Sequence, residues 1–308
     1  MTEPMRPDPI DPAGTAAARD GSRHGAAPPP KPVPAEPADA DGAEDGAGLS
    51  RIRGLWNGFK LAGFALENLA YMMLQARIAP YLWWLRRAGR AAEADAVAYR
   101  MTLVWAERIF RRLGCRIEVE GAGHLRRAGP LVVMSNHQAM YDIPLLAGYL
   151  GRPVGFVFKR ELLLIPVLKY WMRQIHCKAI DRKERRRTPE LYERWGEEIR
   201  DLGRGMVVFP EGTRTRDPQG RFGSFRRGSL RLAERSGIPI QPVVFDGTRL
   251  LTDPAALART PKGERIVRLK ILPVRMPPQG SAPESKRFMD RLRADLAAEW
   301  ERIRVTWG

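Results

Sequence analysis

The stretch Leu131-Val-Val-Met-Ser-Asn-His-Gln-Ala-Met-Tyr-Asp142 is the clearest structural signal in this sequence. Its first four residues are apolar and are followed by polar ones, which is typical of a buried strand. A loop with Asn136 and His137 comes next, and an apolar run to Leu150 predicts a helix. A strand that leads through a short loop into a helix is characteristic of a sheet covered by helices. We therefore expect His137 at the carboxyl end of a strand, the edge where ligand sites of such sheets gather.

The same alternation continues along the chain. Pro189 fits the first turn of a helix that Thr188 can cap, and Leu296 lies in the apolar stripe of the last helix. This pattern predicts an α/β fold. Strands are predicted at 116–120, 131–134, 154–158, 178–180, 206–209, 239–245 and 266–272, and helices at 91–114, 140–150, 166–173, 188–202, 228–235 and 288–300.

Charge is unevenly distributed along the 308 residues, which carry a formal net charge of +17. Nine acidic and four basic side chains lie in residues 1–50, which leaves +22 on the other 258 residues. A body this basic suits an anionic partner: a nucleic acid, an anionic membrane or a phosphorylated substrate. Charge alone does not choose among these. Only two cysteines occur, so no disulfide framework or zinc-ligand spacing is visible.

Composition divides the chain into three parts. Residues 1–50 are rich in Ala, Pro, Asp and Gly and hold almost no large apolar side chains, so we expect a disordered tail. Residues 51–114 are predicted to form apolar N-terminal helices that associate with a membrane. Residues 115–308 are predicted to form the α/β domain.

Residues 61–85 are densely aromatic and apolar. Only Glu67 and Arg77 carry charge there, and basic residues flank the stretch on both sides. An interfacial helix or helix pair, with tryptophan and basic side chains at the headgroup level, fits this pattern best. A spanning helix is disfavoured by the two charges and by Pro80, since a central charge costs about 2.5–3.5 kcal/mol on insertion scales. A helix packed against a soluble core is the third interpretation.

His137 and Asp142 are the first candidates for chemistry. Histidine suits general-base work near neutrality, and a carboxylate on its other ring nitrogen would fix the tautomer. Residues five apart on one helix lie about 140° apart around its axis. The two side chains can therefore meet only if His137 lies in the loop and Asp142 in the first helical turn. Otherwise Asp142 only complements the amino end of that helix.

A second candidate follows the strand predicted at 206–209. The loop Phe209-Pro-Glu-Gly-Thr-Arg214 offers a glycine for close backbone approach, a hydroxyl from Thr213 and a guanidinium from Arg214 that suits phosphate. Glu211 would repel a phosphate directly, so we expect it to orient Arg214 or to accept from a substrate hydroxyl. Taken alone, this loop is more typical of a solvated basic turn than of a binding site.

Two further stretches complete the set. Phe158-Lys-Arg-Glu-Leu162 follows the strand predicted at 154–158, again at its carboxyl end. The stretch Ile238–Val243 is an apolar strand with two prolines, which indicates structure rather than chemistry.

In this order and spacing, the four stretches resemble the conserved blocks of the glycerolipid acyltransferase family, and the resemblance covers residues 115–245. Asn136, His137 and Asp142 match the family's Asn-His-x-x-x-x-Asp block. The other matches are Lys159–Leu162 with Ile165 and Pro166, then Ile180-Asp181-Arg182, then Phe209–Arg214, and finally the proline-containing strand at 238–243.

This resemblance implies a mixed sheet flanked by helices, of the glycerolipid acyltransferase type. It implies an O-acyltransferase in which His137 is the general base, assisted by Asp142. The expected reaction transfers an acyl group from acyl-CoA or acyl carrier protein to the free hydroxyl of 1-acylglycerol-3-phosphate, giving phosphatidic acid. The residues expected to bind the substrate phosphate are Glu211, Gly212, Thr213 and Arg214, with Asn136, Lys159, Arg160 and Arg182 as secondary binding candidates.

The same resemblance sets expectations for cofactors and partners. No metal and no cofactor are expected, because the acyl donor is itself a substrate. The expected partners are an anionic membrane surface, a lysophospholipid acceptor and the acyl donor. The enzyme is expected on the cytoplasmic face of a membrane, as a peripheral or monotopic protein. No recognised nucleic-acid-binding motif is visible, so no nucleic acid is expected.

The second block departs from the family pattern. Lys169, Tyr170, His176 and Cys177 stand where glycines are usual, and their bulk is expected to reshape the acyl tunnel or the acceptor entrance. A Cys177 nucleophile with His176 as its base is disfavoured, because adjacent residues rarely align for that contact.

Three alternatives stay open at this point. One is an acyltransferase for another lysophospholipid or for an acyl-amino-acid lipid. The others are a basic nucleic-acid-binding module and a membrane-binding scaffold without activity.

Overall fold

The computed structural model describes residues 62–181, 188–217 and 219–306. The chain divides into residues 1–52 and 53–308, and only the second unit holds described residues. The tail expected at 1–50 and the binding candidate Arg182 therefore lie outside the described residues.

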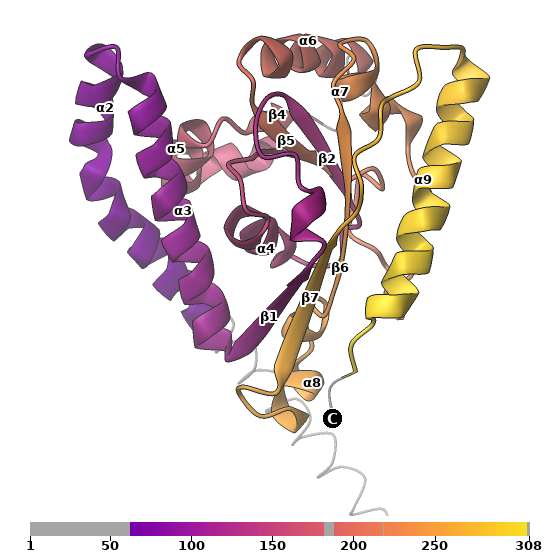
Figure 1. Cartoon of the computed structure of the whole chain (residues 1–308). Helices are drawn as coiled ribbons and strands as arrows, with labels where there is room; N and C mark the ends of the chain where they lie inside the picture. The colour runs from indigo at the N-terminus through magenta and orange to yellow at the C-terminus, as the bar shows by residue number, and fades with distance from the viewer. Residues whose placement is uncertain (1–61, 182–187, 218, 307–308) are drawn as a thin grey trace, which may run out of the picture. The chain divides into compact units, whose positions relative to one another are not determined.

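A mixed sheet forms the centre of the second unit (Figure 1). The described strands follow the order β1-β7-β6-β2-β5-β3-β4, and all neighbours are parallel except the antiparallel pair of β6 and β7. The mixed α/β fold expected from the sequence is thus confirmed. The strands are β1 (Cys115–Glu120), β2 (Leu131–Ser135), β3 (Gly155–Lys159), β4 (Lys178–Ile180), β5 (Gly205–Val208), β6 (Ile240–Asp246) and β7 (Arg265–Ile271).

The three central strands, β5, β2 and β6, are buried on both faces. Every residue of these strands is buried, which explains why they are mostly apolar in the sequence rather than alternating between apolar and polar residues. Because the three are parallel, their carboxyl ends meet at one edge of the sheet.

Helices cover both faces of the sheet (Figure 1). On one face, α3 (Ala91–Leu113) and α4 (Asp142–Tyr149) share a core with the strands, including Phe110 and Leu146. On the other face, α6 (Thr188–Asp201), α7 (Arg231–Glu234) and α9 (Ala282–Ile303) bury Trp195 and Trp300 in a second core. The remaining elements are α2 (Ala79–Arg87), α5 (Pro166–Gln174), α8 (Pro254–Arg259) and the 3₁₀ segments η1 (Ala76–Ile78), η2 (Ala122–His124), η3 (Arg160–Leu164), η4 (Arg227–Leu230) and η5 (Leu250–Thr252).

The helix boundaries differ from the expected ones in a few places. The helix expected at 140–150 begins only at Asp142, so the loop after β2 is longer than the apolar pattern indicates. The helix expected at 228–235 consists of a 3₁₀ turn followed by one short α-helical turn. Helix α8 was not anticipated, and the Asp253 side chain caps it by accepting from the Ala255 amide at 2.9 Å.

The N-terminal helices have one buried face and one exposed face. Residues 62–75 are helical and precede α2, whose Leu82 and Leu85 pack against α3. Trp83 and Trp84 on α2 are exposed. Packing against the protein therefore accounts for only part of this apolar stretch. None of the helices among the described residues has both the length and the apolar character needed to cross a membrane.

Candidate active site

The candidate site lies where β2 and β5 end. These strands are parallel neighbours, with Met134 opposite Val208, so the loops that follow them lie side by side. The first loop carries His137, and the second carries the residues Glu211 to Arg214. The sheet order therefore brings together two stretches that are about 70 residues apart in the sequence.

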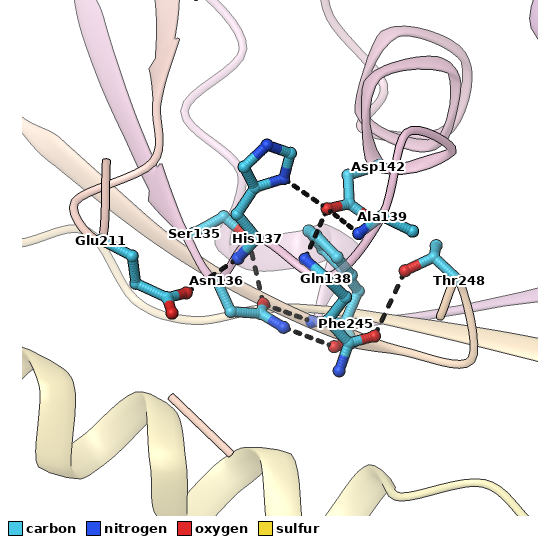
Figure 2. Close-up of polar contacts among 9 residues, drawn as sticks. All are labelled: Ser135, Asn136, His137, Gln138, Ala139, Asp142, Glu211, Phe245 and Thr248. Atoms are coloured by element: carbon cyan, nitrogen blue, oxygen red, sulfur yellow. Dashed lines mark hydrogen bonds and ion pairs between the residues drawn. The ribbon is translucent and has the colours of Figure 1, made fainter. Parts of the chain in front are cut away.

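His137 and Asp142 form a direct hydrogen-bonded pair (Figure 2). The His137 Nδ1 atom lies 2.6 Å from Asp142 Oδ2. Asp142 is the first residue of α4 and its side chain is 0% exposed, whereas the His137 side chain is 16% exposed. His137 lies in the loop and Asp142 in the first helical turn, which is the arrangement that the spacing requires for contact.

The same Asp142 oxygen also orders the backbone of the loop. Oδ2 accepts hydrogen bonds from the amides of Gln138 at 2.7 Å and Ala139 at 2.9 Å (Figure 2). One carboxylate thus holds both the imidazole and the turn that presents it. Charge-assisted bonds of this kind are stronger than neutral ones.

The loop after β5 holds His137 from the other side. The ring of Phe209 stacks on the imidazole, with centroids 4.1 Å apart and planes 12° from parallel. The His137 amide donates to Glu211 Oε1 at 2.9 Å, and the Thr215 amide donates to the His137 carbonyl at 2.8 Å. The position of the imidazole therefore depends on both loops.

Glu211 is a buried residue that accepts hydrogen bonds from the backbone on two sides of the site. It is 4% exposed, and its second oxygen accepts from the Gly223 amide at 2.9 Å. Burial raises the pKa of the Glu211 carboxyl, and the amides of Gly223 and His137 oppose that effect. Because both oxygens face backbone amides, Glu211 has a positioning role, which differs from the phosphate contact and the Arg214 contact expected from the sequence.

The other residues of this loop point to a more open surface. Gly212 has a φ of 68°, a conformation that favours glycine, and a Cβ there would lie 3.2 Å from Arg226 Nε. Thr213 and Arg214 are exposed. The absent side chain at Gly212 therefore leaves room for the Arg226 guanidinium beside the loop, next to the residues predicted to bind phosphate.

Asn136 is fully buried and links the loop to β6. Its Nδ2 donates to the Phe245 carbonyl at 2.9 Å, and its Oδ1 accepts from the Phe245 amide at 3.1 Å (Figure 2). Both ends of the amide are thus used within the protein. This bracing role differs from the substrate-binding role expected for Asn136.

Gln138 connects the loop to the C-terminal helix, a link that the sequence analysis missed. Its Nε2 donates to Asp246 Oδ1 at 2.8 Å, and the same oxygen accepts from Trp300 Nε1 at 2.9 Å. The Thr248 hydroxyl donates to Gln138 Oε1 at 3.2 Å. Gln138 lies within the recognised block, but no local pattern identifies its distant partners.

The remaining candidates lie on the surface or away from the site. Lys159 and Arg160 are exposed and pair with Glu161 at 3.0 Å and Asp181 at 3.5 Å, respectively.

Burial raises the pKa of the Cys177 thiol to about 12, so this thiol is a poor nucleophile near neutral pH. Within the residues that the structure describes, no group of three or more His, Cys, Asp or Glu side chains is placed to hold a metal ion.

Residues 116–246 match the family model described as Acyltransferase. This segment forms an acyltransferase-family domain. The span of the domain runs from β1 to the end of β6 and includes both loops of the site.

Named proteins resemble the acyltransferase domain. The 1-acyl-sn-glycerol-3-phosphate acyltransferase of Pseudomonas aeruginosa is 33% identical over 143 residues, which are 46% of this chain and 53% of that protein. The enzyme of the same name from Saccharomyces cerevisiae is 30% identical over 142 residues, 46% of each chain. The matches thus span about half the length of these curated relatives.

A solved structure shares the fold. The crystal structure of the 1-acyl-sn-glycerophosphate (LPA) acyltransferase from Thermotoga maritima matches with a TM-score of 0.57 and 25% identity. The match covers 79% of this chain and 97% of that chain. It therefore extends beyond the segment that the family model matches.

The bracing role of Glu211 predicts the effect of Glu211→Gln. A glutamine has one acceptor oxygen, so it cannot satisfy the amides of both His137 and Gly223. We expect faster amide hydrogen exchange at these two residues. We also expect turnover to fall about 10- to 100-fold, since a hydrogen bond to a charged group contributes about 1.5–3 kcal/mol. The exposed Glu264→Gln is the matched control, and unchanged exchange at both amides would refute the bracing role.

Proposed function

We propose that this protein transfers a fatty acyl group from a thioester donor to the free hydroxyl of 1-acylglycerol-3-phosphate, giving phosphatidic acid. The observation that carries the proposal is the pair formed by His137 and Asp142 at the carboxyl edge of an acyltransferase-family domain. The names of the relatives from Pseudomonas aeruginosa and Saccharomyces cerevisiae support the choice of acceptor.

The pair leaves one ring nitrogen of His137 for the substrate. When Nδ1 donates its proton to Asp142, the lone pair lies on Nε2. In Figure 2 this nitrogen points away from the carboxylate, and the side chain is partly exposed. Asp142 also stabilises the imidazolium that forms when Nε2 takes a proton.

The proposed reaction is a direct transfer. Nε2 of His137 removes the proton of the acceptor hydroxyl while the oxygen attacks the thioester carbonyl. A C–O bond forms, the C–S bond breaks, and the imidazolium returns the proton to the departing thiolate. The donor is acyl-CoA or acyl carrier protein, no cofactor or metal takes part, and no acyl group becomes attached to the protein.

The acceptor phosphate is proposed to bind at the loop after β5. Gly212, Thr213 and Arg214 lie on the same loop that stacks Phe209 on His137. A guanidinium can bind a phosphate through two parallel hydrogen bonds. Phosphate held here would keep the acceptor hydroxyl near the base. Lys159, Arg160 and Arg182 are secondary candidates for the phosphate or the donor.

An anionic membrane surface is the proposed partner, on the cytoplasmic side, with the protein peripheral or monotopic. The N-terminal helices leave large apolar side chains exposed, and Trp83 is 62% exposed. Arg87 lies over the Trp83 ring at 5.3 Å, and Arg90 lies over the Trp84 ring at 5.4 Å. Tryptophan beside arginine suits the boundary between headgroups and acyl chains.

The proposed base predicts the outcome of His137→Ala. We expect acyl transfer to fall about 10²- to 10⁴-fold with an unchanged circular dichroism spectrum, because general-base catalysis typically contributes that much. The measurement is thiol release from acyl-CoA and acyl carrier protein donors with lysophosphatidic acid as acceptor. The exposed His124→Ala serves as the control. Normal turnover by the His137 variant would exclude this mechanism.

The proposed phosphate site predicts that Arg214→Ala raises KM for lysophosphatidic acid about tenfold or more, since a charge-assisted bond is lost. Turnover of monoacylglycerol, which lacks the phosphate, should be unaffected by the substitution. Arg259→Ala removes an exposed arginine elsewhere and serves as the charge-matched control. Equal KM values for the Arg214 and Arg259 variants would refute the phosphate role.

The proposed membrane contact predicts that the double variant Trp83→Glu/Trp84→Glu binds less well to phosphatidylglycerol vesicles. We expect the partition coefficient to fall roughly tenfold or more, because burying one large apolar side chain contributes about 1.5–3 kcal/mol. Co-sedimentation measures the bound fraction. Met276→Glu changes an exposed apolar residue outside the N-terminal helices and is the control. Undiminished binding of the tryptophan variant would argue against this surface.

A further inference from the structure

A cavity lies at the amino edge of the sheet, opposite the edge that carries His137. Its volume is about 560 Å³, which is within the usual range for small-molecule pockets. It is lined by the first residues of β3 and β5, Gly155 and Gly205, and by parts of α3 and α6.

The cavity is separated from the candidate active site by the length of the sheet. Gly129, which lines the cavity, lies two residues before β2 begins, and His137 lies two residues after β2 ends. The four residue steps of β2 alone span about 13 Å at roughly 3.3 Å per step. A ligand in this cavity is therefore not part of the acyl-transfer site.

Positive charge predominates in the cavity. Four basic side chains line it against two carboxylates, an excess of two positive charges. Lys178 pairs with Glu198 at 2.5 Å, and Arg204 pairs with Asp95 at 2.9 Å. The basic lining residues are Arg127, Arg152, Lys178 and Arg204.

Arg152 is a buried cation whose described contacts are to neutral carbonyl groups. It is 4% exposed, and its guanidinium donates to the carbonyls of Arg126 at 2.6 Å and Gly129 at 2.9 Å. Its Nε has no hydrogen-bond partner among the described residues. Burial, together with the charge of Arg126, lowers the pKa of Arg152. An anion in the cavity would offset the cost of burying this charge.

Asp95 contacts Arg204 and two further side chains at the cavity. Its carboxylate lies 3.0 Å from Arg86 and 3.0 Å from His176 Nε2, in addition to its pair with Arg204. His176 has a φ of 57°, a left-handed conformation that is unfavourable for a residue other than glycine. The chain thus keeps an imidazole in the cavity wall where the backbone favours glycine.

Much of the rest of the wall is apolar. Ala92 and Ala96 of α3 line the cavity. A ligand that fits both halves has an anionic group and a small apolar part. The apolar lining residues include Val154, Ile175, Ile199, Leu202 and Met206.

We propose that this cavity is a second binding site, for a phosphate monoester that carries an apolar group. The excess of positive charge excludes a metal cation as the preferred ligand, and arginine forks suit phosphate oxygens. The ester can come from a soluble metabolite or from the headgroup of a lipid with a terminal phosphate.

The test uses the full chain with Arg214→Ala, which removes the proposed phosphate contact of the active site. Phenyl phosphate is titrated by calorimetry, with inorganic phosphate as the ligand that lacks an apolar part. We expect one site for phenyl phosphate that is weakened at least tenfold by Arg127→Ala and by Arg204→Gln. Arg259→Ala should leave the affinity unchanged. Thermal unfolding of each variant without ligand verifies that the fold is intact.

Several outcomes would overturn the proposal. These are no binding of phenyl phosphate, binding that neither cavity substitution weakens, and equal affinity for inorganic phosphate. Competition with dihexanoylphosphatidic acid, kept below its critical micelle concentration, then shows whether the ligand is a lipid phosphate or a soluble ester. Displacement of phenyl phosphate supports the site with a lipid phosphate as ligand, and failure to displace supports it with a soluble ester. Either result is independent of whether acyl transfer occurs at His137.

Discussion

One buried carboxylate oxygen determines the geometry of the candidate site. Asp142 Oδ2 accepts from the imidazole of His137 and from the amides of Gln138 and Ala139. The loop conformation and the ring orientation are therefore coupled, and one cannot change without the other. Since Asp142 begins α4, the position of the pair also depends on how that helix packs against α3 and the sheet.

The second constraint is that the neighbouring loops hold this turn in place. Phe209 and Glu211 contact His137 from the end of β5, and Asn136 is bonded to Phe245 on β6. Residues that a sequence pattern marks as substrate ligands can thus be positioning residues instead. Glu211 and Asn136 are buried and hydrogen-bonded to the backbone at both ends, whereas Arg214 is exposed.

The two edges of the sheet present different chemistry. The carboxyl edge holds the imidazole with an exposed arginine nearby, as expected for ligand sites in α/β sheets. The amino edge holds a cavity where Arg152 is buried and where Asp95 contacts two arginines and the His176 imidazole. Of the residues that depart from the family pattern, His176 lines this cavity. Basic side chains therefore occur at both edges of the sheet.

The sequence by itself determined the α/β alternation, the apolar central strands and the identity of the His137–Asp142 pair, because strand burial and the ordered motifs are local properties. It did not determine that Glu211 faces two amides, that Gln138 and Trp300 both donate to Asp246, or that His176 contacts Asp95. Apart from the bond between Glu211 and Gly223, these contacts join residues 54 to 108 positions apart. Only the order of the strands and the packing of α3 and α9 bring them within hydrogen-bond distance, and no local pattern encodes that distance.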